Sequence, residues 1–279
     1  MINASIQNMG DNLMKRNIVL TVGAHPADFT NAAGTLANHI RNGDKVFLAI
    51  LTHGINSHFR NTDFRAYLTK ETPSLSDIFA KLKMEKRRET KEAATVLGIE
   101  ESNIRFLDYD DGPLLVEKKI IYDLAVYIRE VRPNMIILHL PTENDHEDHQ
   151  SAGDIGTRAI KAAANYIPQC NLPNYAVKNV FFMMPNYINK YRSFGHVLQA
   201  PDVVINIEDT IDLKREACTK FVSQKYTSEW AKKIWDCVSG IVGIMHGFEY
   251  GEAFISMNPV VSKLLPEMIT RTIYDWEDD

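Results

Sequence analysis

The 279-residue sequence predicts an α/β fold, a Rossmann-like open and mostly parallel sheet with helices on both faces. Two observations predict it. Short apolar runs alternate along the chain with longer segments of helical periodicity. The apolar runs also lack polar alternation, which is typical of strands buried on both faces of a parallel sheet. We therefore expect a single domain over residues 1–279, with an N-terminal extension at 1–16 and a mostly helical part at 208–279.

The first unit of this alternation lies near the N-terminus. Asn17–Gly23 is apolar and β-branched, which favours a strand, and Lys45–Thr52 is a second continuous apolar run. Between them, small and apolar residues recur with helical spacing over 30–43, and the segment ends at Gly43. This order predicts a β-α-β unit with parallel strands.

The same alternation continues along the chain. The further predicted strands are Asn103–Tyr109, Met135–Leu140, Asn179–Pro185 and Asp202–Ile207. The further predicted helices are Ser76–Gly98, Val116–Val131 and His149–Tyr166, followed by mostly helical sequence from residue 208.

The composition indicates a small-molecule partner. The chain has 31 Lys+Arg against 36 Asp+Glu and no long block of like charge, so we expect no nucleic-acid partner. Its three cysteines, in no CxxC spacing, predict neither a disulfide framework nor a zinc finger. No stretch approaches the ~20 apolar residues of a membrane span, and the N-terminal residues lack the apolar core of a signal peptide. We expect a cytoplasmic protein without a membrane partner.

Polar residues follow each of the first four predicted strands. They are His25 and Asp28 after the first strand, His53, His58 and Arg60 after the second, Asp111 after the third, and His146, Asp148 and His149 after the fourth. Ligands of open parallel sheets bind beyond the carboxyl ends of the strands, so these four loops should converge on one cleft.

The histidines and aspartates of two of these loops predict a metal site. His25 and Asp28 are close enough in a turn to share an ion, and the His146–His149 loop adds imidazoles and a carboxylate. Mixed His/Asp ligand sets suit zinc or another divalent ion, and three ligands with an open position are typical of catalytic sites. Either motif alone is also common in loops that bind no metal.

Six motifs between residues 17 and 254 occur together. They are HPADF (from His25), GDKVFLAILTHG, RRETKEAATVLG, FLDYDDGPL, HEDH (from His146) and YGEAF (from Tyr250). Together they resemble the motifs of the PIG-L-type (LmbE-like) deacetylase family, whose first motif is AHPDDE. The resemblance implies the fold of that family, a zinc-dependent reaction with water, and a homo-oligomer, commonly a trimer or hexamer.

The resemblance also implies roles for individual residues. His25, Asp28 and His149 match the zinc ligands of the family. His146 matches the histidine that polarises the substrate carbonyl, where an imidazolium would stabilise developing negative charge. Asp148 matches a carboxylate that orients a ligating imidazole, a role that Asp145 could also serve.

One position departs from the family pattern. Ala27 stands where the deacetylases have an aspartate that acts as general base, and Phe29 stands where they usually have a glutamate. HPADF instead resembles the H-x-A-D-F pattern of a hydratase branch that acts on 4-oxalomesaconate. Those hydratases also carry a glutamate after the second strand, whereas this chain offers His53, His58 and Arg60 there.

Three functions are therefore compatible with the sequence. The first expectation is hydrolysis of an N-acyl amide on a small polar or sugar-like substrate. The alternative is a hydratase that adds water to an unsaturated carboxylate, and the third is a non-catalytic protein that binds a metal or ligand. A zinc assay with an N-acetyl amino sugar and an unsaturated dicarboxylate would separate them.

Several other residues are candidates for contact with the substrate. Asp111 lies in a DDG sequence and is either a substrate contact or a turn residue before Gly112. His246, just before YGEAF, either reaches the mouth of the cleft or packs as a structural histidine. Arg87 and Arg88 could bind carboxylates, but their charged helix favours a solvated face or ion pairs.

Overall fold

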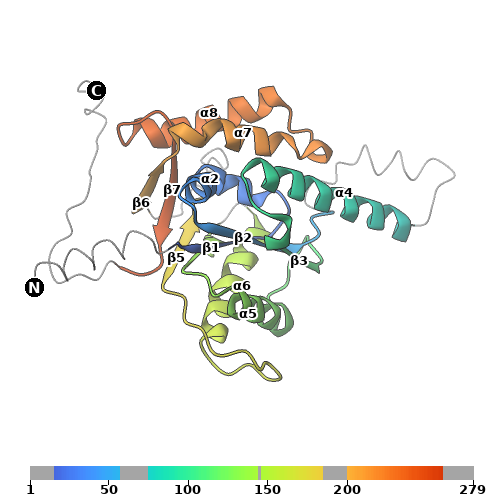
Figure 1. Ribbon diagram of the computed structural model, residues 1–279. Helices are drawn as coiled ribbons and strands as arrows, with labels where there is room; N and C mark the ends of the chain where they lie inside the picture. Colours follow the sequence, from blue (N-terminus) through green and yellow to red (C-terminus); the bar gives the residue numbers. More distant parts are fainter. Residues whose placement is uncertain (1–15, 57–74, 144–145, 185–199, 260–279) are drawn as a thin grey trace, which may run out of the picture.

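The computed structural model describes residues 16–56, 75–143, 146–184 and 200–259. A seven-stranded sheet with the order β3-β2-β1-β4-β5-β7-β6 forms its centre (Figure 1). The strands are β1 (Ile18–Gly23), β2 (Lys45–Thr52), β3 (Ile104–Tyr109), β4 (Met135–His139), β5 (Asn179–Met183), β6 (Val203–Asn206) and β7 (Gly251–Ser256). The first five are parallel, and β7 pairs antiparallel with both β5 and β6.

Helices cover both faces of the sheet, as the sequence predicted (Figure 1). They are α2 (Ala33–Arg41), α4 (Leu75–Val96), α5 (Lys118–Val131), α6 (Glu147–Ala163), α7 (Ile211–Thr219) and α8 (Ser228–Ile244). Buried side chains of α5 and α6 form one core with the sheet, and those of α2, α4 and α7 form another on the opposite face. Within the described ranges, no helix combines the length and the apolar character needed to cross a bilayer.

The order of the strands determines where a site can form. β1 pairs with β2 on one side and with β4 on the other. The chain therefore adds β2 and β3 on one side of β1, and then crosses over to add β4 and β5 on the other side. Such a reversal opens a crevice beyond the carboxyl ends of the two central strands. The loops after β1 and β4, which carry the two predicted metal motifs, therefore lie side by side.

One strand was not predicted. The sequence analysis expected mostly helical structure after residue 208, but Gly251–Ser256 forms β7 between β5 and β6. The strand is short and carries a glycine and a glutamate, so its local pattern does not indicate a strand. Pairing with two strands that are distant in the sequence makes it one.

Glu252 of β7 explains the late YGEAF motif. Its carboxylate accepts hydrogen bonds from the backbone N–H groups of Gly34 (2.9 Å) and Thr35 (2.8 Å) in the first turn of α2. A carboxylate at this end also opposes the positive end of the helix dipole. The buried Lys214 ammonium lies 2.6 Å from Glu252 Oε1 and 4.0 Å from the centre of the Trp235 ring. The motif therefore fixes α2, which directly follows the loop with Asp28.

Candidate metal centre

His25 and Asp28 lie in the tight turn after β1. The His25 backbone N–H donates to Asp28 Oδ2 at 2.7 Å, and His25 Nδ1 lies 3.5 Å from the same oxygen. Asp28 begins a short 3₁₀ helix, Asp28–Ala32, and both side chains are buried. The turn therefore holds an imidazole and a carboxylate in fixed positions at the carboxyl end of β1.

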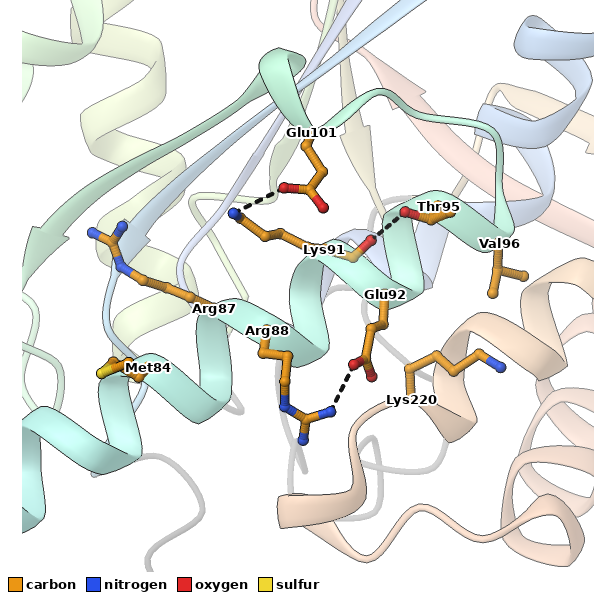
Figure 2. Close-up of a pocket in the computed structure, with 9 residues that line it drawn as sticks. All are labelled: Met84, Arg87, Arg88, Lys91, Glu92, Thr95, Val96, Glu101 and Lys220. Atoms are coloured by element: carbon orange, nitrogen blue, oxygen red, sulfur yellow. Dashed lines mark hydrogen bonds and ion pairs between the residues drawn. The ribbon is translucent and has the colours of Figure 1, made fainter.

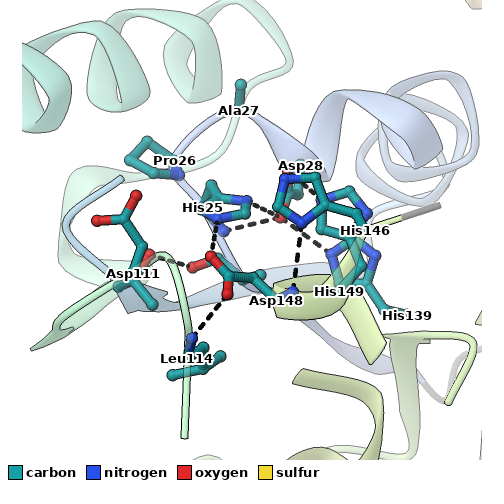
Figure 3. A network of polar contacts seen from close by, with 12 residues as sticks. His25, Pro26, Ala27, Asp28, Asp111, Leu114, His139, His146, Asp148 and His149 are labelled. Atoms are coloured by element: carbon teal, nitrogen blue, oxygen red, sulfur yellow. Dashed lines mark hydrogen bonds and ion pairs between the residues drawn. The ribbon is translucent and has the colours of Figure 1, made fainter. Parts of the chain in front are cut away.

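The segment after β4 adds three more imidazoles. His139 is the last residue of β4, His146 is the N-cap of α6, and His149 lies in the first turn of that helix. The ring centres of His146 and His149 are 4.3 Å apart, and that of His25 lies 4.9 Å from His146 and 5.4 Å from His149 (Figure 3). The two predicted loops thus meet, as expected from the parallel sheet.

Asp148 holds the ring of His25. Its Oδ2 lies 3.0 Å from His25 Nε2 and accepts the Gly112 N–H at 2.9 Å, while Oδ1 accepts the Leu114 N–H at 2.6 Å. Burial opposes the negative charge, but the hydrogen bond from His25 and those from the backbone hold the pKa of Asp148 well below its usual range. Asp148 therefore stays ionised and leaves Nδ1 of His25 directed towards Asp28.

Asp28 and His149 are held in the same way by other residues. Asp28 Oδ2 also contacts His139 Nε2 at 3.0 Å, and His149 Nδ1 contacts Glu143 Oε1 at 3.0 Å. Asp28 Oδ1 faces His149 Nε2 at 3.5 Å. One atom of each predicted ligand is thus fixed by a protein partner, and the other points towards the centre of the cluster.

Three groups of side chains among the described residues are spaced closely enough to hold a metal ion. They are His25 with His146 and His149, Asp28 with His139 and His149, and His25 with Asp111 and Asp148. None contains all three predicted ligands at once, although His149 appears with each of the other two. The donor types and the burial fit a divalent ion of the zinc class.

The protonation of the cluster supports this fit. Burial disfavours a charged imidazole, yet the Asp28 and Asp148 carboxylates raise the pKa of His25 to about 9. Asp28 and Glu143 likewise overcome burial and raise the pKa of His149 to about 10. Without an ion, protons balance these buried carboxylates, and a bound cation would supply the same positive charge.

The pKa of His146 lies below that of an ordinary histidine. Burial and the positive charges of His149 and His25 lower the pKa of His146 to about 4, so the ring is neutral at pH 7. Its Nδ1 accepts the Asp148 backbone N–H at 3.3 Å, which leaves the proton on Nε2. His146 can therefore donate a hydrogen bond from Nε2 without carrying a charge.

Asp111 and His53 join the loops after β2 and β3. The buried Asp111 carboxylate accepts the N–H groups of Ile55 (3.1 Å) and Asn56 (2.8 Å) and lies 3.1 Å from His53 Nδ1. The hydrogen bond to Asp111 raises the pKa of His53; burial opposes this, but the contact with Asp110 adds to it, and the net shift is upward. A cavity of ≈ 290 Å³ opens beside His53. Asp111 is thus a structural link, and His53 lies at a cavity where a substrate could bind.

The structure does not bring His246 to the cluster. His246 bonds to the Val242 carbonyl at the end of α8 through Nδ1 (2.8 Å), and no hydrogen bond or ion pair in the described part of the chain joins it to the cluster. His58 and Arg60, and the alternative carboxylate Asp145, lie outside the described residues.

A second, larger hollow lies on the outer side of α4. It has a volume of ≈ 700 Å³ and is lined by Arg87, Arg88 and Lys91 (Figure 2). Arg88 pairs with Glu92 at 2.7 Å, Lys91 pairs with Glu101 at 2.9 Å, and Arg87 pairs with Asp108. The hollow contains none of the clustered histidines. The two arginines therefore form ion pairs on a solvated face, as their charged helix favours.

A family profile described as "PIG-L: GlcNAc-PI de-N-acetylase" matches residues 20–160, just over half of the chain. The chain belongs to the PIG-L family. A 4-oxalmesaconate hydratase from Pseudomonas putida is 24% identical over 218 residues, which cover 77% of each chain.

Two solved structures illustrate the range of the PIG-L fold. GalB, the 4-carboxy-2-hydroxymuconate hydratase of Pseudomonas putida, superimposes with a TM-score of 0.71 and 23% identity over 90% of this chain and 100% of its own. An N,N'-diacetylchitobiose deacetylase from Pyrococcus horikoshii gives 0.66 and 20% identity over 92% of each chain. At these identities the similarity establishes a common fold, which hydratases and deacetylases share.

Ala27 is buried in this PIG-L protein. It is 8% exposed and belongs to the apolar cluster that includes Ala93 and Ala94 of α4. Its methyl group points away from the clustered histidines (Figure 3). Position 27 thus provides packing and no carboxylate.

Sequence reasoning missed His139 and Glu143. Both are buried beside the predicted ligands. The available signal was a histidine at the end of a predicted strand with a glutamate four residues later. The strand pattern made His139 look like part of the sheet, and a glutamate in a polar loop is commonplace.

Proposed function

We propose that this PIG-L protein is a metal-dependent hydratase that adds water to an unsaturated carboxylate. The observation that carries the proposal concerns the carboxylates of the described residues around the histidines. Each accepts hydrogen bonds from fixed donors, and Ala27 occupies the position of the aspartate base implied by the family resemblance. A hydrolase lacking that base would forgo ~10²–10⁴-fold in rate.

His25, Asp28 and His149 would hold the divalent ion. When bound, the ion would supply a Lewis acid that polarises a substrate oxygen. His146 would donate from Nε2 to the keto or carboxylate oxygen of the substrate, where a neutral donor suffices to stabilise developing charge. His53 lines a cavity that would take a distal part of the substrate, and its two nitrogens are held by Asp110 at 2.8 Å and Asp111 at 3.1 Å.

Hydration also places a smaller demand on the protein than amide hydrolysis. The oxygen of water bonds to one alkene carbon as the C=C π bond breaks, the attacking water loses one proton, and one proton is added to the neighbouring carbon, so no group leaves. Amide hydrolysis must in addition protonate a departing amine. Both reactions need a group that takes a proton from water, but hydration needs no further acid for a leaving amine, so it makes the smaller demand on a site with alanine at position 27.

N-deacetylation, the first expectation from the sequence, is the second candidate. It is favoured by the family to which the chain belongs and by the fold shared with the Pyrococcus horikoshii deacetylase. This reaction would require a base supplied by another group.

The test compares both reactions on one zinc-loaded preparation. Loss of ultraviolet absorbance of a conjugated keto-dicarboxylate would report hydration, and release of acetate from an N-acetyl amino sugar would report hydrolysis. We expect hydration that a chelator abolishes and that His146→Asn reduces at least 100-fold. His246→Asn is the matched control and should retain full activity, because His246 bonds only locally to Val242 among the described contacts. Acetate release without hydration would contradict the proposal.

A further inference from the structure

We infer that Glu143 and His139 form a positioning pair, which orients His149 and Asp28 so that one atom of each is free for the metal. The inference rests on the metal site of the proposed function, but it does not depend on which reaction occurs there. It assigns a purpose to two buried polar residues that the proposed reaction itself does not use.

The turn after β4 brings the two residues together. His139 ends the strand, and the Glu143 N–H donates to the Leu140 carbonyl at 3.0 Å, which closes a turn. The Glu143 carboxylate therefore returns to the end of β4, where Oε2 lies 3.8 Å from His139 Nδ1. Glu143 is 6% exposed and His139 is 2% exposed, so water contributes little to the orientation of either side chain.

Glu143 determines which nitrogen of His149 is free. An ionised carboxylate only accepts hydrogen bonds, so the contact of 3.0 Å between Oε1 and Nδ1 requires the His149 proton on Nδ1. The lone pair of a neutral His149 then lies on Nε2, the atom that faces Asp28 at 3.5 Å. A metal-ligating imidazole needs this kind of partner on its other nitrogen.

His139 does the same for Asp28. Its Nε2 lies 3.0 Å from Asp28 Oδ2, which also accepts the His25 N–H at 2.7 Å. Two donors therefore occupy Oδ2, and Oδ1 remains directed towards His149. The His139 ring also stacks on that of His149, with centres 4.1 Å apart and an angle of 25° between their planes. It thus restricts rotation of His149 as well.

The alternative is that His139 itself ligates the ion. Asp28, His139 and His149 are spaced closely enough to hold one. A positioning residue and a ligand make different predictions. Removing a positioning residue weakens binding but keeps the coordination number, whereas removing a ligand changes the coordination.

The test measures zinc affinity of the full chain by competition with a chromophoric chelator. Glu143→Gln keeps the shape but removes the charge, and we expect affinity to fall 10- to 100-fold, the usual effect of losing such a partner. Glu143→Asp should recover part of the loss. Glu147→Gln is the matched control, since Glu147 is exposed in the first turn of α6, and its affinity should stay within twofold.

Two spectroscopic measurements separate positioning from a general structural effect. Nitrogen-15 NMR of the zinc-loaded protein should show His149 protonated on Nδ1, and Glu143→Gln should weaken that signal through faster proton exchange. The absorption spectrum of the cobalt(II) form should keep its intensity in His139→Asn, because the coordination number is unchanged.

Three results would overturn the inference. They are an unchanged affinity in Glu143→Gln, a His149 proton on Nε2, and a changed cobalt spectrum in His139→Asn, which would make His139 a ligand. Failure of the unmutated protein to bind zinc would instead refute the metal site itself. Zinc binding with neither reaction detectable would refute the proposed function and leave the inference standing.

Discussion

Zinc affinity should depend steeply on pH in this protein. His25 and His149 have pKa values of about 9 and about 10 without metal, against 6.5 for an ordinary histidine. Both must lose a proton before they can ligate an ion. At pH 7 each imidazole is therefore protonated, and zinc must displace two protons.

The size of the effect follows from these values. Two displaced protons increase the apparent association constant about 100-fold per pH unit, hence about 10⁴-fold from pH 6 to pH 8. Two histidines of ordinary pKa would give less than about twofold between pH 7 and pH 8, because both would already be neutral.

The assay is chelator competition at half-unit steps of pH, corrected for the titration of the chelator. Calorimetry in two buffers of different ionisation enthalpy counts the protons released at pH 7, and we expect two. His246→Asn is the control, since this histidine bonds to the Val242 carbonyl at 2.8 Å and no described hydrogen bond or ion pair joins it to the cluster. A slope below one, or fewer than one proton released, would refute the electrostatic reasoning.

Four further outcomes are expected. Ala27→Asp should not raise N-deacetylation if the protein is a hydratase, and a tenfold gain in acetate release would contradict that proposal. Glu252→Gln should lower the free energy of unfolding by about 3–5 kcal/mol in urea titrations, because it leaves the buried Lys214 without its ion-pair partner, and adding Lys214→Met should restore part of it, since an amide still cannot accept both the Gly34 and the Thr35 N–H. Gly153→Ala should lower the free energy of unfolding by about 1–3 kcal/mol and weaken zinc binding, since the added Cβ would lie 2.6 Å from the His139 carbonyl oxygen. Gly240→Ala is its control: the added Cβ meets nothing within 4 Å, so this change should stabilise α8. In metal-free protein, the raised pKa values of His25 and His149 stabilise the fold fully below pH 6.5, and this stability is lost as the pH rises through about 9 and 10. The melting temperature should therefore fall over that pH range, and it should fall less when zinc is bound.

Local sequence was sufficient to predict the central part of the fold. Continuous apolar runs such as Lys45–Thr52 indicate strands buried on both faces, and helical spacing between them indicates parallel connections. Because parallel strands end at one edge, the loops with His25 and with His149 were expected at the same edge of the sheet, and the pairing of β1 with β4 places them side by side. The candidate metal ligands could be named from the sequence because they lie in two short segments.

Tertiary structure decided the features that depend on distant partners. β7 is a strand only because β5 and β6 flank it, and Glu252 reaches the start of α2 across 218 residues of sequence. The local sequence pattern of β7 does not indicate that β5 and β6 will pair with it.

The protonation states of the histidines at the site could not be predicted from the sequence either. His146 and His149 are three residues apart, yet burial and neighbouring charges lower the pKa of one to about 4 and raise that of the other to about 10. The positions of His139 and Glu143 beside the predicted ligands follow from the turn after β4. Protonation and hydrogen-bond partners depend on which groups share a buried space, and only the folded chain creates that space.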